Sequence, residues 1–184
     1  IKEDLSKILI GLFDLNQSDF DKALNKYDKS VNKNKIGGNE SIALSLANYM
    51  CAANFKKIYL FEHASKNNKF TLPKPEIQIF GGGAHADNLA SFQDFLIYPI
   101  EDVDINNFFE MTFDIYNDVK EKLKKNGLLK GYSDEGGFYP SKLNHYEICD
   151  YILNSSVKCG YKPGRDIAIS IDVAATELFF DSRY

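Results

Sequence analysis

The feature that most constrains the fold is a change of pattern at a proline-rich segment, Leu72-Pro73-Lys74-Pro75. The sequence before it has helical periodicity, and the sequence after it alternates short β-branched segments with helical ones. Because proline lacks an amide donor and restricts the residue before it, neither a helix nor a central strand runs through this segment. The sequence therefore predicts two parts, residues 1–70 and residues 71–184.

Two helices are predicted within the first part. One apolar stripe at helical spacing contains five residues: Phe20, Ala23, Leu24, Tyr27 and Val31. Ser18 is the expected N-cap of this helix. Residues 41–54 are apolar on most sides, which is typical of a helix buried within the fold.

The second part mixes strands and helices. The expected elements are a strand at 76–80, a strand at 92–99, a helix at 104–126, a helix at 143–159 and a strand at 167–171. Gly127 and Gly160 are expected to end the two helices. This order of strand, strand, helix, helix and strand predicts an α/β layer architecture. Glycines and acidic residues follow the strands, which indicates chemistry at the carboxyl ends of strands, as in α/β barrels.

The amino-acid composition excludes some classes of binding partner. The net charge of −4, from 22 Lys and Arg against 26 Asp and Glu, is unlike that of a nucleic-acid-binding protein. The basic cluster at 120–125 is expected at a helix end, where cations favour the helix dipole. No apolar run approaches the roughly 18 residues of a membrane span, and no signal peptide is visible. Three cysteines without metal-ligand spacing are interpreted as reduced thiols, which favours a cytoplasmic protein.

A glycine-rich turn presents one candidate ligand-contacting residue. The three glycines 81–83 follow a predicted strand and precede His85. Glycines let the backbone approach a ligand closely, so His85 is a candidate for substrate contact. A structural or solvated loop histidine is the alternative. No Gly-Lys-Ser/Thr follows the glycines, so a P-loop is not indicated.

Three acidic positions are candidates for proton transfer or metal binding. Glu135 follows Asp134 and precedes two glycines, and only one of two adjacent strand residues can face a site. A carboxylic acid tuned for proton transfer and a plain acidic turn are the two interpretations. Asp172 directly follows an apolar strand, where a charge needs a partner or a cation. Asp94 lies among phenylalanines, which implies partial burial, and an edge acid facing water is the alternative.

Seven segments, taken in order, resemble the enolase family of glycolytic phosphopyruvate hydratases. The resemblance covers nearly the whole chain, but only the middle of an enolase. The segments are Gly38-Asn39-Glu40-Ser41-Ile42-Ala43-Leu44-Ser45-Leu46-Ala47, Leu72-Pro73-Lys74-Pro75, Gly82-Gly83-Ala84-His85-Ala86-Asp87-Asn88, Phe92-Gln93-Asp94-Phe95-Leu96-Ile97-Tyr98-Pro99, Asp134-Glu135-Gly136-Gly137-Phe138-Tyr139-Pro140, Gly160-Tyr161 and Asp172-Val173-Ala174-Ala175-Thr176-Glu177.

The resemblance implies a fold. Residues 1–70 would be the later, helical part of an enolase N-terminal capping domain. Residues 71–184 would be the first strands and helices of an enolase-type α/β (TIM-like) barrel, whose second strand runs antiparallel.

The resemblance also implies a Mg²⁺-dependent lyase that reversibly dehydrates 2-phosphoglycerate to phosphoenolpyruvate in glycolysis. Glu135 would be the general acid for the leaving hydroxyl group, and Asp94 would assist it through hydrogen bonds and contact the substrate. His85 would lie near the substrate. Asp172 would be the first carboxylate ligand of Mg²⁺. A cytoplasmic homodimer is expected from the resemblance, with neither nucleic acid nor membrane as a partner.

Three departures from the family pattern are informative. Asp94 replaces the usual glutamate, which draws its carboxylate back by about 1.5 Å. Gly81 stands where the family usually has asparagine, and Ser133 replaces a usual glycine. They suggest a divergent enolase, and a non-catalytic enolase-derived binding or structural module is the alternative.

The 184 residues alone are not expected to be active. Both ends of the sequence look cut, and the family's base lysine and its other two metal carboxylates would lie after Tyr184. One carboxylate does not make a tight Mg²⁺ site. The isolated chain is therefore predicted neither to bind Mg²⁺ tightly nor to turn over 2-phosphoglycerate.

Overall fold

A computed structural model describes residues 2–10, 16–65, 67, 69–83 and 92–184. The chain divides into two compact units, Ile1–Leu72 and Pro73–Tyr184. Each unit is described by itself.

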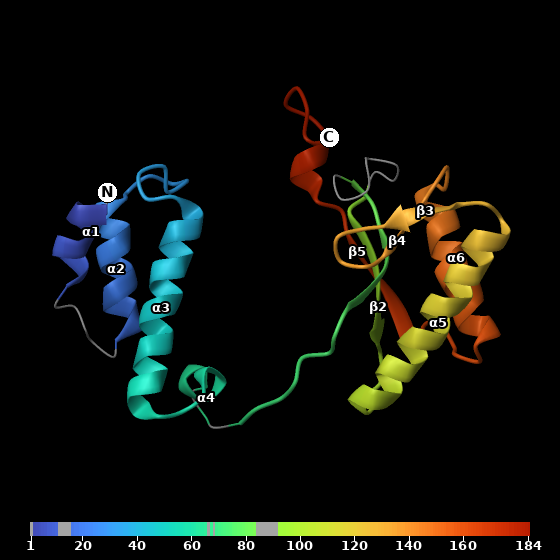
Figure 1. The fold of residues 1–184 in the computed structure, drawn as a ribbon, viewed down its shortest axis with the longest axis horizontal. Helices are drawn as coiled ribbons and strands as arrows, with labels where there is room; N and C mark the ends of the chain where they lie inside the picture. The colour runs from blue at the N-terminus through green and yellow to red at the C-terminus, as the bar shows by residue number, and fades with distance from the viewer. Residues whose placement is uncertain (1, 11–15, 66, 68, 84–91) are drawn as a thin grey trace. The chain divides into compact units, whose positions relative to one another are not determined.

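The regular secondary structure of the first unit, over its described residues, consists of helices joined by loops (Figure 1). Its helices are α1 (Lys2–Leu9), α2 (Gln17–Tyr27), α3 (Gly38–Lys56) and α4 (Leu60–Ala64). A small core joins them, made of the buried side chains of Leu5, Phe20, Leu24 and Ile36. Three of the predicted stripe residues contribute to this cluster, with Phe20 and Leu24 buried and Tyr27 packed against them.

Both predicted details of the ends of α2 are wrong. Its N-cap is Asn16, whose side chain accepts a hydrogen bond from the amide of Ser18. Helix α2 ends at Tyr27, so Val31 lies in a loop with 96% of its surface exposed. The buried carboxylate of Asp28 explains this early end, because it accepts hydrogen bonds from the loop amides of residues 30, 35 and 36. A carboxylate that satisfies three loop donors stabilises a turn in place of further helix.

Helix α3 confirms the predicted helix at 41–54 but not its burial. Only Ala52 and Ala53 are buried. Ile42, Leu46 and Phe55 remain largely exposed. Helices α2 and α4 pack against α3 but leave these side chains uncovered.

The second unit contains an open sheet of five strands, not a closed barrel. Its strands are β1 (Ile77–Gly81), β2 (Asp94–Pro99), β3 (Leu129–Tyr132), β4 (Phe138–Pro140) and β5 (Ile167–Asp172). The order across the sheet is β3-β4-β1-β2-β5. Strand β2 is antiparallel to both β1 and β5, and β4 is parallel to β1. The expected antiparallel second strand is therefore confirmed.

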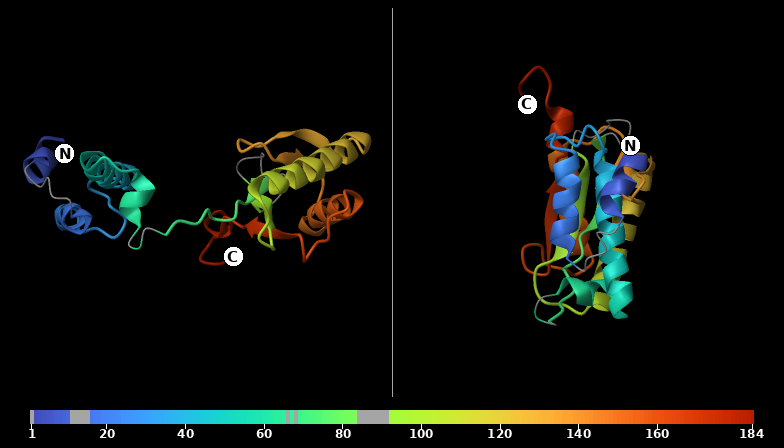
Figure 2. Two further views of the ribbon diagram at one scale, coloured as in Figure 1. Left: turned by 90° about the horizontal axis from the view of Figure 1, so that it is seen from below. Right: turned by 90° about the vertical axis from the view of Figure 1, so that its left-hand side faces the viewer.

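Helices α5 (Ile105–Lys125) and α6 (His145–Lys158) pack against this sheet (Figures 1 and 2). Both predicted helices are confirmed, and Gly127 and Gly160 follow their ends with positive φ angles. Apolar residues at helical spacing on both helices meet the strands in one core. Its fully buried members include Phe80, Phe95, Phe108, Ile115, Phe138, Ile148 and Ile152.

The prediction of one helix directly after the other is wrong, because the hairpin β3–β4 lies between them. The two strands pair antiparallel, with Tyr132 opposite Phe138. At four and three residues they are too short for an alternating pattern to show. A 3₁₀ turn at Ala175–Leu178 follows β5.

Candidate active site at one edge of the sheet

Four chain segments meet at one edge of the sheet, the edge formed by the ends of strands and not by an outer strand. The directions in which the strands run bring these segments together. The end of β1 lies beside the start of β2, since Gly81 pairs with Asp94. The end of β5 lies on the other side of β2, since Asp94 also pairs with Asp172. The β3–β4 turn reaches the same edge, because the start of β4 pairs with the end of β1. This edge carries Asp94, Asp172 and Glu135.

Asp94 is buried, with 5% of its surface exposed. Its Oδ1 accepts a hydrogen bond from Gln78 Nε2, and its Oδ2 accepts one from Gln93 Nε2 at 3.2 Å. Strands on both sides of β2 exclude water, so the alternative of an edge acid facing solvent is wrong. A buried carboxylate needs such donors to offset its lost hydration.

Gln78 is the connecting residue of the site, and the sequence pattern did not predict its role. Its Nε2 donates to Asp94 and also to Glu135 Oε2, at 3.3 Å. A register shift between Gln78 and Phe80 places two residues of β1 against one residue of β2. Such a bulge re-aims side chains, here with Phe80 in the core and Gln78 among the carboxylates. The available signal was a lone glutamine inside the apolar strand 77–80.

Glu135 lies in the turn between β3 and β4, not on a strand as expected. The reason is the pair of glycines that follows, because Gly136 adopts a φ of +93° that disfavours other residues. The Gly136 carbonyl accepts a hydrogen bond from the hydroxyl of Tyr116 on α5, at 2.7 Å. Glu135 itself is exposed. Glu135 thus carries a solvent-accessible carboxyl group on a turn that Tyr116 of α5 holds in place.

Asp172 is the last residue of β5 and is exposed. Strand β5 is an edge strand and only Ile167 is fully buried in it, so the expectation of a charge ending a buried strand is wrong. Asp172 Oδ1 accepts a hydrogen bond from the amide of Ala174 at 2.8 Å, which fixes the carboxylate near the strand end.

His85 lies outside the described residues. Of its glycine turn, Gly82 and Gly83 are described, and the amide of Gly82 donates to the carbonyl of Gln93 at 2.6 Å. This bond ties the start of the turn to the residue before Asp94.

The described residues do not form a complete metal site. Across residues 2–10, 16–65, 67, 69–83 and 92–184, no group of three or more His, Cys, Asp or Glu side chains could hold a metal ion. Asp172 offers one suitable oxygen donor, whereas Mg²⁺ and Ca²⁺ take six or more ligands in all.

Two of the departures from the family pattern are in contact. A Cβ atom built on Gly81 would lie 2.4 Å from both Cβ and Oγ of Ser133. The hydroxyl of Ser133 donates to Gln78 Oε1 at 2.7 Å, and the amide of Gly137 donates to the same oxygen at 2.8 Å. Gly81 therefore leaves the space that the Ser133 side chain occupies.

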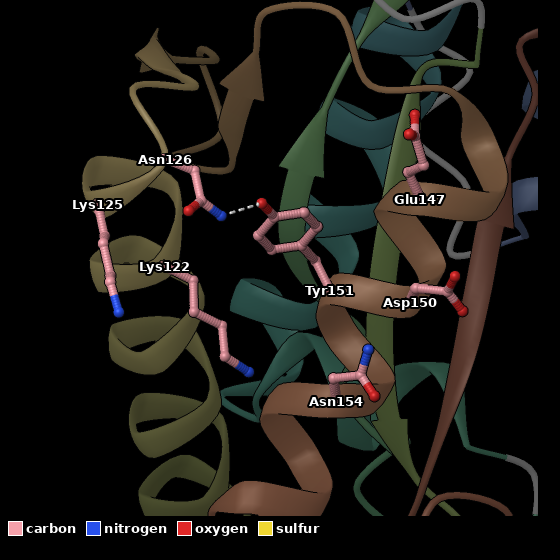
Figure 3. A pocket seen from close by; sticks show the side chains of 7 residues that line it. All are labelled: Lys122, Lys125, Asn126, Glu147, Asp150, Tyr151 and Asn154. Carbon is pink, nitrogen blue, oxygen red and sulfur yellow. Dashed lines mark hydrogen bonds between the residues drawn. The ribbon is translucent and has the colours of Figure 1, made fainter.

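A groove of about 380 Å³ between α5 and α6 is not this site (Figure 3). Asn126 Nδ2 donates to the hydroxyl of Tyr151 across it, at 2.7 Å. Glu147 caps α6 through the amide of Asn144, and Lys122 pairs with Asp118. These side chains serve helix packing. The lining residues are Lys122, Lys125, Asn126, Glu147, Asp150, Tyr151 and Asn154.

An α/β layered domain in which three acidic side chains gather where strand ends and a turn meet is arranged like part of an α/β-barrel enzyme domain. Comparisons with known proteins agree. Residues 69–184 match the enolase C-terminal TIM barrel domain, and residues 1–64 match the enolase N-terminal domain. The chain belongs to the enolase family.

Curated relatives support the same family over the whole chain. An enolase from Natranaerobius thermophilus is 35% identical over 184 residues, and one from Acidothermus cellulolyticus is 36% identical. The match covers 100% of this chain and 43% of each relative, so the chain spans less than half their length. Among the described helices, none has the length and apolar character to cross a membrane. All three cysteines are free thiols.

Proposed function

We propose that the protein carrying this chain is a phosphopyruvate hydratase, which reversibly dehydrates 2-phosphoglycerate to phosphoenolpyruvate in glycolysis. The observation that carries the proposal is the shared donor Gln78, which brings the carboxyl groups of Asp94 and Glu135 into one site. Residues 1–70 would belong to the capping domain and residues 71–184 to the barrel.

The arrangement suits general acid catalysis. The exposed carboxyl group of Glu135 can exchange protons with solvent and, when protonated, donate one to the departing hydroxyl group. The buried Asp94 shares the Gln78 donor and would influence where that proton resides. His85 would contact the substrate.

Mg²⁺ is the proposed metal ion, and Asp172 would be one of its ligands. When bound, such a cation would stabilise negative charge on the substrate carboxylate. The described residues supply only part of the ligand set that such a cation needs.

The test is phosphoenolpyruvate formation by the protein from the full open reading frame. We expect turnover that a chelator abolishes and Mg²⁺ restores. Glu135→Gln should lower kcat by about 10²- to 10⁴-fold. Glu121→Gln is the matched control, since Glu121 is an exposed residue of α5 paired with Lys124, and it should leave kcat unchanged. No turnover by the unaltered protein would favour the non-catalytic module.

Assembly and location are proposed from the family. The protein would be a cytoplasmic homodimer without a nucleic-acid or membrane partner, which light scattering and cell fractionation would test. The isolated 184-residue chain should show neither turnover nor tight Mg²⁺ binding. Activity in that chain would refute this part of the proposal.

A further inference from the structure

We propose that Gln78 is a positioning residue that sets the placement of Asp94 relative to Glu135, and that Ser133 orients Gln78 by filling the space left by Gly81. The proposal rests on the proposed function where catalysis is concerned. Its geometric part stands on contacts within the second unit.

The orientation of the Gln78 amide is fully determined by its partners. Its oxygen accepts from the Ser133 hydroxyl at 2.7 Å and from the Gly137 amide at 2.8 Å. With the oxygen held by two donors, the NH₂ group is the end that faces the two carboxylates. A flipped amide would place its oxygen against both carboxylates and set the donating Gly137 amide against an NH₂ group.

The side chain of Gln78 is closely packed by its neighbours. Gln78 is buried, with 7% of its surface exposed. A Cβ atom on Gly137 would lie 2.5 Å from Gln78 Oε1, so glycine is required there for the amide to approach. On the other side, a Cβ atom on Gly81 would collide with Ser133. Beside Gly81 there is room for a side chain at position 81 or at position 133, and in this chain it is that of Ser133.

The placement has a chemical consequence. Asp94 is fixed on β2 between two neighbouring strands, whereas Glu135 is on an exposed turn. Gln78 donates a hydrogen bond to each of them and so links the two carboxyl groups. Removing its NH₂ group would free the Glu135 carboxyl group to move, and displacement of about 1 Å at a catalytic group can cost about 100-fold in rate.

Catalysis by the full-length protein gives the first test. Gln78→Leu should lower kcat for 2-phosphoglycerate by about 100-fold while KM changes less than about threefold. Gln17→Leu is the matched control, because Gln17 also bridges side chains in a polar network, with Asp21 and Ser45, but in the first unit. It should leave kcat unchanged. An unchanged kcat in Gln78→Leu, or a loss confined to KM, would overturn the proposal.

A double-mutant cycle of unfolding stability, measured on the 184-residue chain, tests the geometry without an activity assay. Gly81→Ala alone should lower the urea midpoint of the second unit, because the new methyl group meets Ser133. Adding Ser133→Gly to Gly81→Ala should restore most of the loss. Additive effects of the two substitutions would contradict the shared space.

The same chain reports the orientation of Gln78 directly. The side-chain NH₂ protons of Gln78 should exchange slowly with water in the unaltered chain and faster in Ser133→Gly, as followed by NMR. Fast exchange in both would overturn the orienting role of Ser133. Absence of turnover in the full-length protein, with the cycle and the NMR result as expected, would refute the proposed function and leave the geometric assignment intact.

Discussion

Replacing Asp118 with asparagine should destabilise the second unit by about 1.5 kcal/mol at neutral pH. Asp118 on α5 pairs with Lys122 one turn later, at 2.8 Å, and with Lys158 at the end of α6. Its side chain is only 9% exposed. It therefore joins the two helices that cover the sheet, through a carboxylate that water reaches poorly.

The magnitude follows from the pKa of Asp118. Burial raises this pKa, but hydrogen bonds from Lys122, Lys158 and Ser155 outweigh burial and lower it from 3.8 to about 2. That difference corresponds to about 2.4 kcal/mol of stabilisation when the carboxylate is charged. Lys158 is 66% exposed, so solvent screens part of the interaction, which reduces the expected value to about 1.5 kcal/mol.

The dependence on pH has a definite sign. A lowered pKa in the folded state means that the stabilisation is fully present above pH 3.8 and is lost as the pH falls toward 2. Asp118→Asn removes it at every pH. The difference in stability between the unaltered chain and Asp118→Asn should therefore be largest at pH 7 and should shrink between pH 4 and 2.

Urea unfolding followed by pulsed hydrogen exchange separates the two units, because peptides from residues 105–125 and 145–158 report only the second. A loss of about 1.5 kcal/mol shifts the urea midpoint by about 1 M for a unit of this size. Glu121→Gln, which breaks an exposed pair with Lys124 on the same helix, should change it by less than about 0.5 kcal/mol. An equal effect of both substitutions, or a difference that grows toward pH 2, would refute the role of Asp118 in joining α5 to α6.

Two further outcomes are expected in the same chain. Asp28→Ala should speed hydrogen exchange at residues 30–36 and destabilise the first unit. Because hydrogen bonds from Ser30 and the loop amides outweigh burial and lower the Asp28 pKa, the contribution should be present above about pH 4 and fade in acid, as amide exchange at several pH values would show. Tyr116→Phe should remove the bond to the Gly136 carbonyl, destabilise the β3–β4 turn by about 1 kcal/mol and lower kcat in the full-length protein. Exchange rates of the Ser133 and Gly137 amides would check it, and unchanged rates would contradict it.

The helices of the second unit were predictable because their burial is one-sided. Helix α5 places Phe108, Ile115 and Val119 on one face, and that spacing shows in the sequence. The hairpin was not predictable in the same way, because β3 and β4 are too short to alternate and β3 also contains glycine and lysine. The prediction that α3 is buried failed for another reason, since apolar composition does not say which neighbours cover a helix.

The acidic residues of the site were predictable, but their environments were not. Asp94, Glu135 and Asp172 follow or begin strands, which local patterns reveal. Whether each is buried depends on strand order, and β2 lies inside the sheet while β5 lies at its edge. Gln78 was missed because its role arises from contacts with residues 16 to 59 positions away, which no local pattern encodes.

The short side chain of Asp94 and the long side chain of Gln78 form one matched pair. Their side chains are already in contact, and both residues are buried, so a further methylene at position 94 would push the carboxylate about 1.5 Å into the amide. Asp94→Glu, although it restores the usual family residue, should therefore lower kcat in the full-length protein by tenfold or more, on the order of the cost of an ångström-scale misplacement. Adding Gln78→Asn, which removes one methylene from the partner, should recover most of that loss. Higher activity in Asp94→Glu alone would show that the site has room for the longer acid and that the two lengths are not coupled.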